Sequence, residues 1–349
     1  MATQRVMANR AFLKDLFAGP FRGHAILMDP EGPTVDWLAG DFAISERPLQ
    51  EWLPLFADVY ARRVRWHEGV GDDSVPYVQL GTGTELFAAA FGCATHRHDG
   101  SPPSARPLVT TAREADALAV PDLSHPVLSR VFEMGRLVQR ELGTDVPIGV
   151  PDIQSPFDIA ALIWNKEDMF AALYESPDAV HRLVAKCQQL LVTFLREFLR
   201  QFPNANLCHC PYAWAPPELG CWLSEDEAGS LSVPMFAEFC LPSLVDLSAS
   251  FGGLFMHCCA TADHQYGNFR RIPNLRGLNR VFQAPGPRPA LEAFSGHTVF
   301  MVAWTQEQDM LRMLDLALPN TRFLCDMPAQ PLDDARRTFE RLRVRCPRR

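Results

Sequence analysis

The feature that most limits how this chain can fold is an alternation of strand and helix signals from about residue 146 onward. Short apolar segments typical of buried strands are separated by longer segments with the spacing of amphipathic helices. Neighbouring parallel strands need a crossover of about a dozen residues or more, usually a helix, so this alternation predicts a parallel sheet flanked by helices. With about seven or eight strands, the predicted α/β fold is a closed (β/α)8 TIM barrel.

Local signals place the individual elements. Ser155 and Ser176 are each followed by a proline and an acidic residue, which is typical of a helix N-terminus. Another helix is expected from Ser232 to Gly252, with a kink at Pro242. We expect strands at residues 146–150, 206–210, 220–224, 254–257, 276–281, 297–302 and 321–324, further helices after residue 289, over 306–318 and from 331, and a loop over 99–107.

The segments 206–210 and 220–224 break the alternation. Only about ten residues separate them, too few for a parallel crossover helix. We therefore expect this part of the chain to be an excursion from the barrel.

Composition excludes several classes of function. The formal net charge is −8, which does not favour binding to the phosphates of nucleic acid. No apolar run approaches the roughly 18 residues of a membrane span, and the first residues lack the pattern of a secretory signal. We therefore expect a cytoplasmic protein. Its ten cysteines are then expected to be reduced thiols that serve packing, metal binding or catalysis.

One cluster of cysteine and histidine has the pattern of a metal site. His257, Cys258 and Cys259 end one expected strand, and Cys325 follows another. Side chains alternate along a strand, so His257 and Cys259 should share a face and Cys258 should face the other way. One imidazole and two thiolates would hold zinc with its fourth position open, as in catalytic sites. The alternative is that these are ordinary buried cysteines beside a strand histidine.

Four segments together resemble the uroporphyrinogen decarboxylase superfamily, and within it the zinc-dependent methyltransferases that act with methylated corrinoid proteins. The segments are residues 75–93, 149–157, 224–242 and 251–259, within a resemblance that spans roughly residues 75 to 340. The resemblance implies a TIM barrel with an N-terminal helical extension in one structural domain. Residues 1–74 would form the extension, packed on a barrel of residues 75–349.

The metal pattern of those methyltransferases is His-x-Cys and, after a long gap, Cys. It matches His257, Cys259 and Cys325, so replacing Cys325 by serine should remove the metal. Many relatives have glycine where this chain has Ala260. The arginine-rich motif that grips porphyrinogen carboxylates in the decarboxylase itself is not seen near the N-terminus, so porphyrin decarboxylation is not expected.

The resemblance implies zinc as the resident metal and a methyl group exchanged between a small substrate and a corrinoid. The chain has no Asp-x-His-x-x-Gly stretch of the kind that holds a corrinoid, so methylcobalamin or a related corrinoid would come on a partner protein. A thiol substrate would be held as thiolate by zinc and attack the methyl group. The superfamily often pairs, so a homodimer is also expected.

Other polar residues fall at expected strand ends, each with a structural alternative. Glu225 and Asp226 are candidate catalytic residues that could supply a fourth metal ligand, support the ligands from outside or position substrate; the alternative is a helix N-terminal acid pair. Asp152 is a candidate catalytic residue that could equally cap a helix. The candidates for binding substrate or cofactor, or else for packing or capping, are Gln154, His209, Tyr212 and Trp304; Asp263 or His264 could orient His257.

Two other functions remain open at the level of sequence. The same barrel could be a decarboxylase or carbon–carbon lyase that needs no metal. It could also be a catalytically silent barrel that binds a small molecule or the corrinoid partner. Activity that survives chelation would favour the lyase, and tight binding without turnover or metal would favour the silent barrel.

Overall fold

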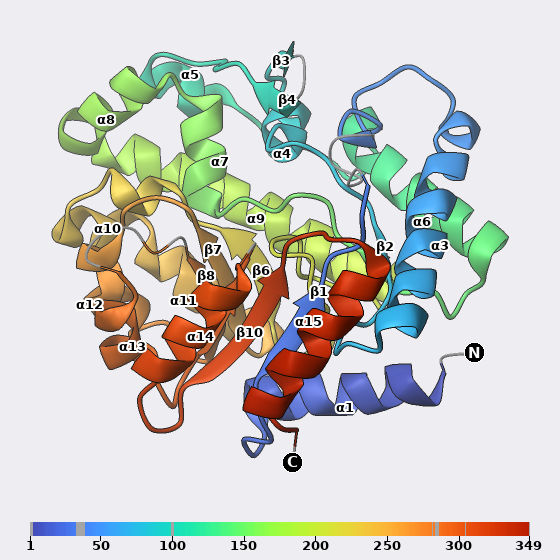
Figure 1. The fold of residues 1–349 in the computed structure, drawn as a ribbon. Helices are drawn as coiled ribbons and strands as arrows, with labels where there is room; N and C mark the ends of the chain where they lie inside the picture. The colour runs from blue at the N-terminus through green and yellow to red at the C-terminus, as the bar shows by residue number, and fades with distance from the viewer. Residues whose placement is uncertain are drawn as a thin grey trace.

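The computed structural model describes residues 3–32, 39–98, 101–280, 282, 286–303 and 305–348, and its centre is a parallel β-barrel (Figure 1). The larger part of the barrel is a six-stranded sheet in which every neighbouring pair is parallel. In spatial order its strands are β1 (Ala25–Met28), β10 (Arg322–Met327), β9 (Val299–Val302), β8 (Leu275–Arg280), β7 (Leu254–Cys258) and β6 (Cys221–Ser224).

A second, shorter parallel pair completes the wall. It consists of β2 (Val78–Gln79) and β5 (Ile148–Gly149). A bridge between Gln154 and Ser224 joins the segment after β5 to β6, and the backbone N–H of Asp73, just before β2, donates to Ile26 O of β1. The predicted TIM-barrel fold is therefore confirmed.

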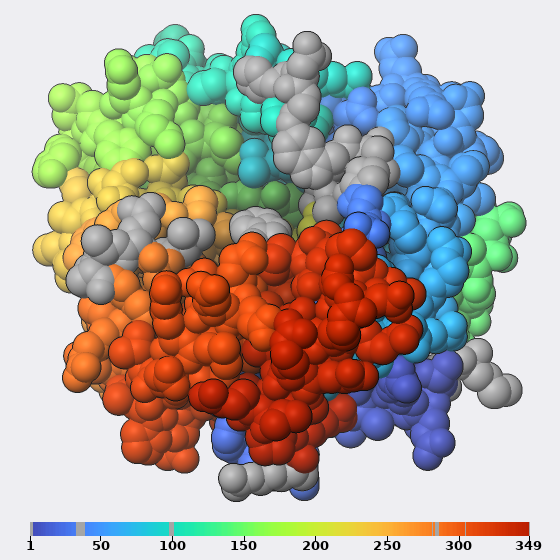
Figure 2. Space-filling view, in the orientation of Figure 1, coloured from blue at the N-terminus to red at the C-terminus, as the bar shows by residue number. Residues whose placement is uncertain are grey.

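Helices surround the strands on the outside of the barrel (Figure 1). In Figure 2, α14 and α15 (orange to red) make up much of the face turned toward the viewer. The helices are α1 (Gln4–Ala18), α3 (Leu53–Val70), α4 (Leu86–Ala90), α5 (Ala112–Ala117), α6 (Pro126–Leu142), α7 (Pro156–Ile163), α8 (Lys166–Glu175), α9 (Pro177–Gln201), α10 (Val233–Phe239), α11 (Leu241–Phe251), α12 (Tyr266–Phe269), α13 (Arg288–Phe294), α14 (Glu307–Leu316) and α15 (Leu332–Arg345). Among the described residues, no helix combines the length and apolar character that crossing a membrane requires.

The strands separate two apolar cores. Phe255 of β7 faces the barrel interior, where its ring lies 5.0 Å from that of Phe17 and 5.6 Å from that of Trp222. Met256 and Cys258 of the same strand face the outer core, beneath the helices. Phe17 comes from α1, so the N-terminal helix contributes to the interior core of the barrel.

Most helix signals in the sequence are confirmed. The Ser155 hydroxyl accepts a hydrogen bond from the backbone of Asp158 at the start of α7, and α9 begins at Pro177. The helix expected from Ser232 to Gly252 is instead two helices, α10 and α11. Pro242 lies in the first turn of α11, where its missing N–H costs no helical hydrogen bond, so the chain breaks there rather than bends.

The strand expected at residues 206–210 is wrong. Only Asn206 makes a bridge, to Gly149, and the following residues form a loop. The Asn206 side chain organises this loop: its Nδ2 donates to Cys208 O and Ala213 O, and its Oδ1 accepts from Ala215 N. A side-chain amide thus replaces the strand ladder, and this loop is the expected excursion.

The division at residue 74 does not hold for β1. This strand lies in the segment predicted to be a helical extension, yet it pairs with β10 in the barrel sheet. The carboxylates of Asp72 and Asp73 accept hydrogen bonds from Met28 N and Ile26 N, which fix the strand from its other side. The four residues of β1 are all buried and do not alternate between apolar and polar side chains, so their pattern did not predict a strand. The rest of the domain division stays a prediction.

The loop expected over residues 99–107 is partly a hairpin. Strands β3 (Thr95–His98) and β4 (Ser101–Ala105) pair in antiparallel fashion. Residues 99 and 100 lie outside the described residues.

Candidate functional site

Three side chains that can bind a metal meet at the carboxyl ends of neighbouring strands. His257 is on β7, Cys259 is the first residue after β7, and Asp226 follows β6. One donor atom from each of the three lies within 4.8 Å of the other two. In barrels of this type, chemistry is found at this end of the strands. We regard this Asp226–His257–Cys259 group as the candidate metal site.

The ring of His257 is held by Asn279 of β8. The Asn279 amide nitrogen donates to Met301 O at 2.5 Å, so its oxygen is left to face His257 Nδ1, also at 2.5 Å. An amide oxygen can only accept, so Nδ1 carries the proton and Nε2 presents its lone pair. Nε2 lies 3.9 Å from Asp226 Oδ1. Metal-binding histidines are commonly oriented by such a bond from their other ring nitrogen.

The carboxylate of Asp226 is placed between backbone and sulfur. The Asp226 backbone N–H donates to Asp158 Oδ2 at 2.7 Å. The Asp226 side-chain atom Oδ1 accepts from Cys259 N at 2.8 Å and from Cys259 Sγ at 3.2 Å. Burial, and then the charge of Asp226, raise the pKa of Cys259 to about 12. A divalent cation would reverse this effect, because a coordinating thiol loses its proton.

Cys325 does not lie with these donors, which corrects the expected ligand set. Strand β10 continues to Met327 instead of ending at Leu324, so Cys325 lies within it. Leu324 belongs to the interior core and Cys325 to the outer core. Burial, then Cys346 and Asp326, raise the pKa of the Cys325 thiol. The expected opposite orientation of Cys258 is confirmed, since it is fully buried in the outer core.

A second polar group lies inside the barrel mouth around Asp152. Its Oδ1 accepts from Gln154 Nε2 at 2.6 Å and lies 3.4 Å from His209 Nε2, which is also 3.1 Å from Ser224 Oγ. Burial raises the pKa of Asp152 to about 6, offset in part by Gln154 and His257. Burial and the proximity of His257 lower the pKa of His209. These predicted residues are therefore neighbours of the candidate metal site.

Glu225 and Tyr212 lie elsewhere. The Glu225 side chain is fully buried, and burial followed by the carboxyl of Asp158 raises its pKa. Tyr212 lines a small cavity with Asp29 and Arg63, whose guanidinium is 5.1 Å from the centre of the tyrosine ring. Neither residue lines the cavity beside His257.

Asn279 takes the role that was expected of Asp263 or His264. Asp263 instead forms an ion pair with Arg280, and His264 Nε2 contacts Leu231 O. Asn279 belongs to no motif, and the signal that could have found it is register: it lies directly opposite His257 in the pairing of β7 with β8. Trp304, the other pocket candidate, lies outside the described residues.

A cavity of about 720 Å³ opens beside the candidate metal site, within the range of small-molecule sites. Its polar end holds Cys210, His257, Cys259 and Asn279. Cys210 was not singled out from the sequence, although its Sγ lies 3.5 Å from His257 Nδ1. The remaining described wall is Arg280, Phe282, Pro287, Val302, Ala303, Thr305, Asp309, Arg312, Met313 and Leu316.

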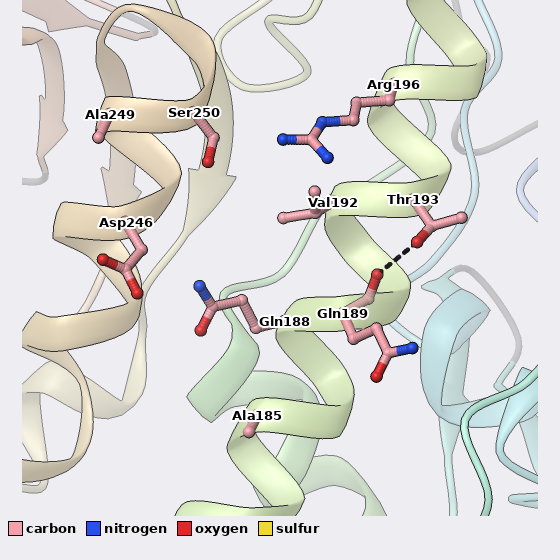
Figure 3. A pocket seen from close by; sticks show the side chains of 9 residues that line it. All are labelled: Ala185, Gln188, Gln189, Val192, Thr193, Arg196, Asp246, Ala249 and Ser250. Carbon is pink, nitrogen blue, oxygen red and sulfur yellow. Dashed lines mark hydrogen bonds between the residues drawn. The ribbon is translucent and has the colours of Figure 1, made fainter.

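Another hollow, of about 640 Å³, lies on the outer helix layer between α9 and α11 (Figure 3). Its side chains are mainly small or amide-bearing, as Gln188 and Ser250 illustrate, and Thr193 is bonded to its own helix. It lacks a group of metal-binding side chains among the described residues.

Comparisons with known proteins agree with this architecture. Residues 81–215 match the family model described as Uroporphyrinogen decarboxylase (URO-D), and the predicted resemblance to that superfamily is confirmed. No curated protein matches the sequence. Among solved structures, a methyltransferase from Methanosarcina mazei superposes with a TM-score of 0.67 at 15% identity, covering 95% of this chain and 97% of that one. At this identity the likeness shows the fold alone.

A pair of buried carboxyl groups at the end of β1 and β10 gives a testable pH dependence. Burial raises the pKa of Asp29 to about 6, and burial and Asp29 raise that of Asp326 well above its usual value, while Arg63 offsets part of both shifts. A carboxyl whose folded pKa is raised contributes stability below its unfolded pKa and loses it as pH rises through the folded pKa.

Replacing Asp326 by asparagine should therefore stabilise the protein at pH 8, by about 1–3 kcal/mol, and have little effect near pH 4.5. Urea unfolding of both proteins at the two pH values measures the difference. Asp333→Asn, at an exposed position in the first turn of α15, is the control. An Asp326→Asn variant that is less stable than the parent at pH 8 would contradict the argument.

Proposed function

We propose that this protein is a zinc-dependent methyltransferase that moves a methyl group between a small substrate and a corrinoid carried by a partner protein. The observation that carries the proposal is the candidate metal site, Asp226, His257 and Cys259, at the mouth of a barrel beside a cavity of about 720 Å³. The match to the decarboxylase family model and the fold shared with a methanogen methyltransferase support it.

The donor set fits zinc. Zinc accepts imidazole nitrogen, thiolate sulfur and carboxylate oxygen, whereas magnesium and calcium prefer oxygen alone. One thiolate, one carboxylate and a neutral imidazole balance the charge of a divalent ion, as two thiolates and an imidazole would. Three protein ligands are also the usual number in catalytic zinc sites. Asp226 thus takes the place that the sequence assigned to Cys325.

The metal would supply one function, to keep an incoming thiol deprotonated at neutral pH. The chain's own residues supply the rest. Asn279 holds His257 in the tautomer that leaves Nε2 free to bind. Asp152, with a pKa of about 6, is ionised at neutral pH and can accept a proton beside the site. The apolar wall at Val302 and Met313 would lie against a bound substrate and keep water from that side of it.

The experiment combines metal analysis with a methyl-transfer assay. Purified protein should contain about one zinc per chain, and cobalt substitution should give a thiolate-to-metal charge-transfer band. With free methylcobalamin and a small thiol, the absorbance change of the corrinoid should report transfer. Chelation should abolish transfer and added zinc should restore it. Full activity after chelation, or no specific metal binding, would overturn the proposal.

Asn279→Ala should lower zinc affinity by about 10–100-fold, because the His257 ring loses the acceptor that fixes its orientation. Asn279→Asp, which retains an acceptor oxygen for His257 but loses the donor to Met301 O, should recover only part of the affinity. Competition with a chromogenic chelator measures both, and circular dichroism checks that the variants are folded. Equal zinc affinity in the alanine variant and the parent would show that Asn279 does not position the ligand.

A further inference from the structure

The cavity beside the candidate metal site is apolar over most of its described wall. Its side chains away from the metal end come from β9, from α14 and from the segment between β8 and α13. They include a phenylalanine, a proline, a valine, a methionine and a leucine: Phe282, Pro287, Val302, Met313 and Leu316. Such a wall gains most by covering apolar surface of a ligand, because that surface leaves water.

Each cation of the described wall already has a carboxylate partner. Arg280 Nη2 lies 2.8 Å from Asp263 Oδ1, and its Nη1 donates to the backbone oxygen of Cys258 at 3.2 Å. The Arg280 side chain is only 2% exposed, and both of its terminal nitrogens take part in these contacts. Arg312 Nη1 lies 3.2 Å from Asp309 Oδ1. The Arg312 side chain is 74% exposed, so it is a solvated surface cation, and an anionic group held deeper, against the apolar wall, would have to displace Asp263 from Arg280 or lie with its charge unmatched.

We propose that the small substrate of this site is an uncharged thiol with an apolar body, such as an aryl or branched alkyl thiol, and not a short thiol that carries an anionic group. This inference rests on the proposed function and names its substrate class. The sulfur would lie at the end formed by Cys210, His257 and Cys259. The apolar body would lie against Val302 and Met313.

The reaction this implies is balanced. The thiol first loses its proton, which Asp152 or water accepts. The thiolate sulfur then forms a bond to the methyl carbon of the methylated corrinoid. The cobalt–carbon bond breaks with its electron pair remaining on cobalt, so Co(III) becomes Co(I). The products are a neutral methyl thioether and the reduced corrinoid.

The test compares probes that differ in charge. Calorimetry on the zinc-loaded protein would use phenylmethanethiol, 4-(mercaptomethyl)benzoate, which adds one carboxylate to the same body, and 2-mercaptoethanesulfonate. We expect the neutral thiol to bind at least tenfold more tightly than either anion and to accept methyl groups from methylcobalamin. An anion that binds as tightly as phenylmethanethiol would overturn the inference.

A variant tests the cavity itself. Leu316 lies on the cavity wall and is 44% exposed, so Leu316→Asp should fold and should weaken binding of phenylmethanethiol at least tenfold. Leu108, which is equally exposed but lies away from the cavity, gives the matched control Leu108→Asp, with affinity unchanged. Melting temperatures confirm that both variants are folded. Undiminished affinity in Leu316→Asp, or an equal loss in both, would contradict the assignment.

The failure of this inference can be told apart from failure of the proposed function. Benzyl methyl sulfide has no thiol and needs no metal to bind, so its affinity for the metal-free protein reports the cavity alone. If it binds but zinc and methyl transfer are not found, the proposed function fails and the ligand class stands. If zinc and transfer are found but the anionic thiols are preferred, only the ligand class fails.

Discussion

Cys259→Ser should lower zinc affinity on the order of 100-fold or more and abolish methyl transfer, whereas Cys325→Ser should leave both close to the parent values. The contrast follows from where the two sulfurs lie. Cys259 Sγ is 3.2 Å from Asp226 Oδ1 and lines the cavity, while Cys325 is buried in the outer core. Serine keeps the size of the side chain but loses the thiolate.

Zinc content after dialysis and the rate of transfer from methylcobalamin measure this contrast. Cys258→Ser is a further control, because Cys258 is adjacent to the site in sequence but faces the outer core. If Cys325→Ser releases the metal while Cys259→Ser retains it, the assignment of Asp226, His257 and Cys259 as the metal ligands is wrong. Loss of the metal in both variants would instead favour the ligand set expected from the sequence, which would need a rearrangement of β10.

The largest expected loss of stability is for Phe255→Ala, at about 3–5 kcal/mol. Phe255 is 1% exposed at the centre of the barrel, between the rings of Phe17 and Trp222. Gly277 lies beside it, and a Cβ there would come within 2.8 Å of the phenylalanine ring. The ring therefore fills the space that the glycine leaves, and alanine would open a cavity there.

Guanidinium unfolding followed by tryptophan fluorescence measures this loss. Phe21→Ala, at a side chain that is 38% exposed, should cost well under half as much. Zinc binding should survive in folded Phe255→Ala, since the ligands lie at the rim. A change of less than about 1 kcal/mol would show that the interior repacks more freely than its geometry indicates.

Local signals explain which parts of the fold the sequence predicted. The start of α7 depends on a serine, a proline and an acid within four residues, and the structure has the predicted cap at Ser155. The strand that leads to His257 is a continuous apolar run, and β7 follows it. The loop after Asn206 could not be predicted, because its order depends on one amide side chain that contacts residues up to nine positions away.

The site was predicted in part for a similar reason. The period of two along a strand placed His257 and Cys259 on one face and Cys258 on the other. Cys325 was expected to follow a strand that ended at Leu324; β10 instead continues three residues beyond Leu324, and within the strand Leu324 faces the interior and Cys325 the outer core. The role of Asn279 could not be predicted, because it depends on the register between β7 and β8. The register between distant segments has no local signature in the sequence.

The bond from Asn279 to Met301 has a consequence for how the two halves of the site influence each other. Met301 precedes Val302, so a ligand that presses on the cavity wall acts on the strand whose carbonyl holds the amide that orients His257. These contacts give ligand occupancy a route by which it can affect metal affinity. Such effects are reciprocal: if bound metal raises the affinity for an apolar ligand by some factor, the bound ligand raises the affinity for the metal by the same factor.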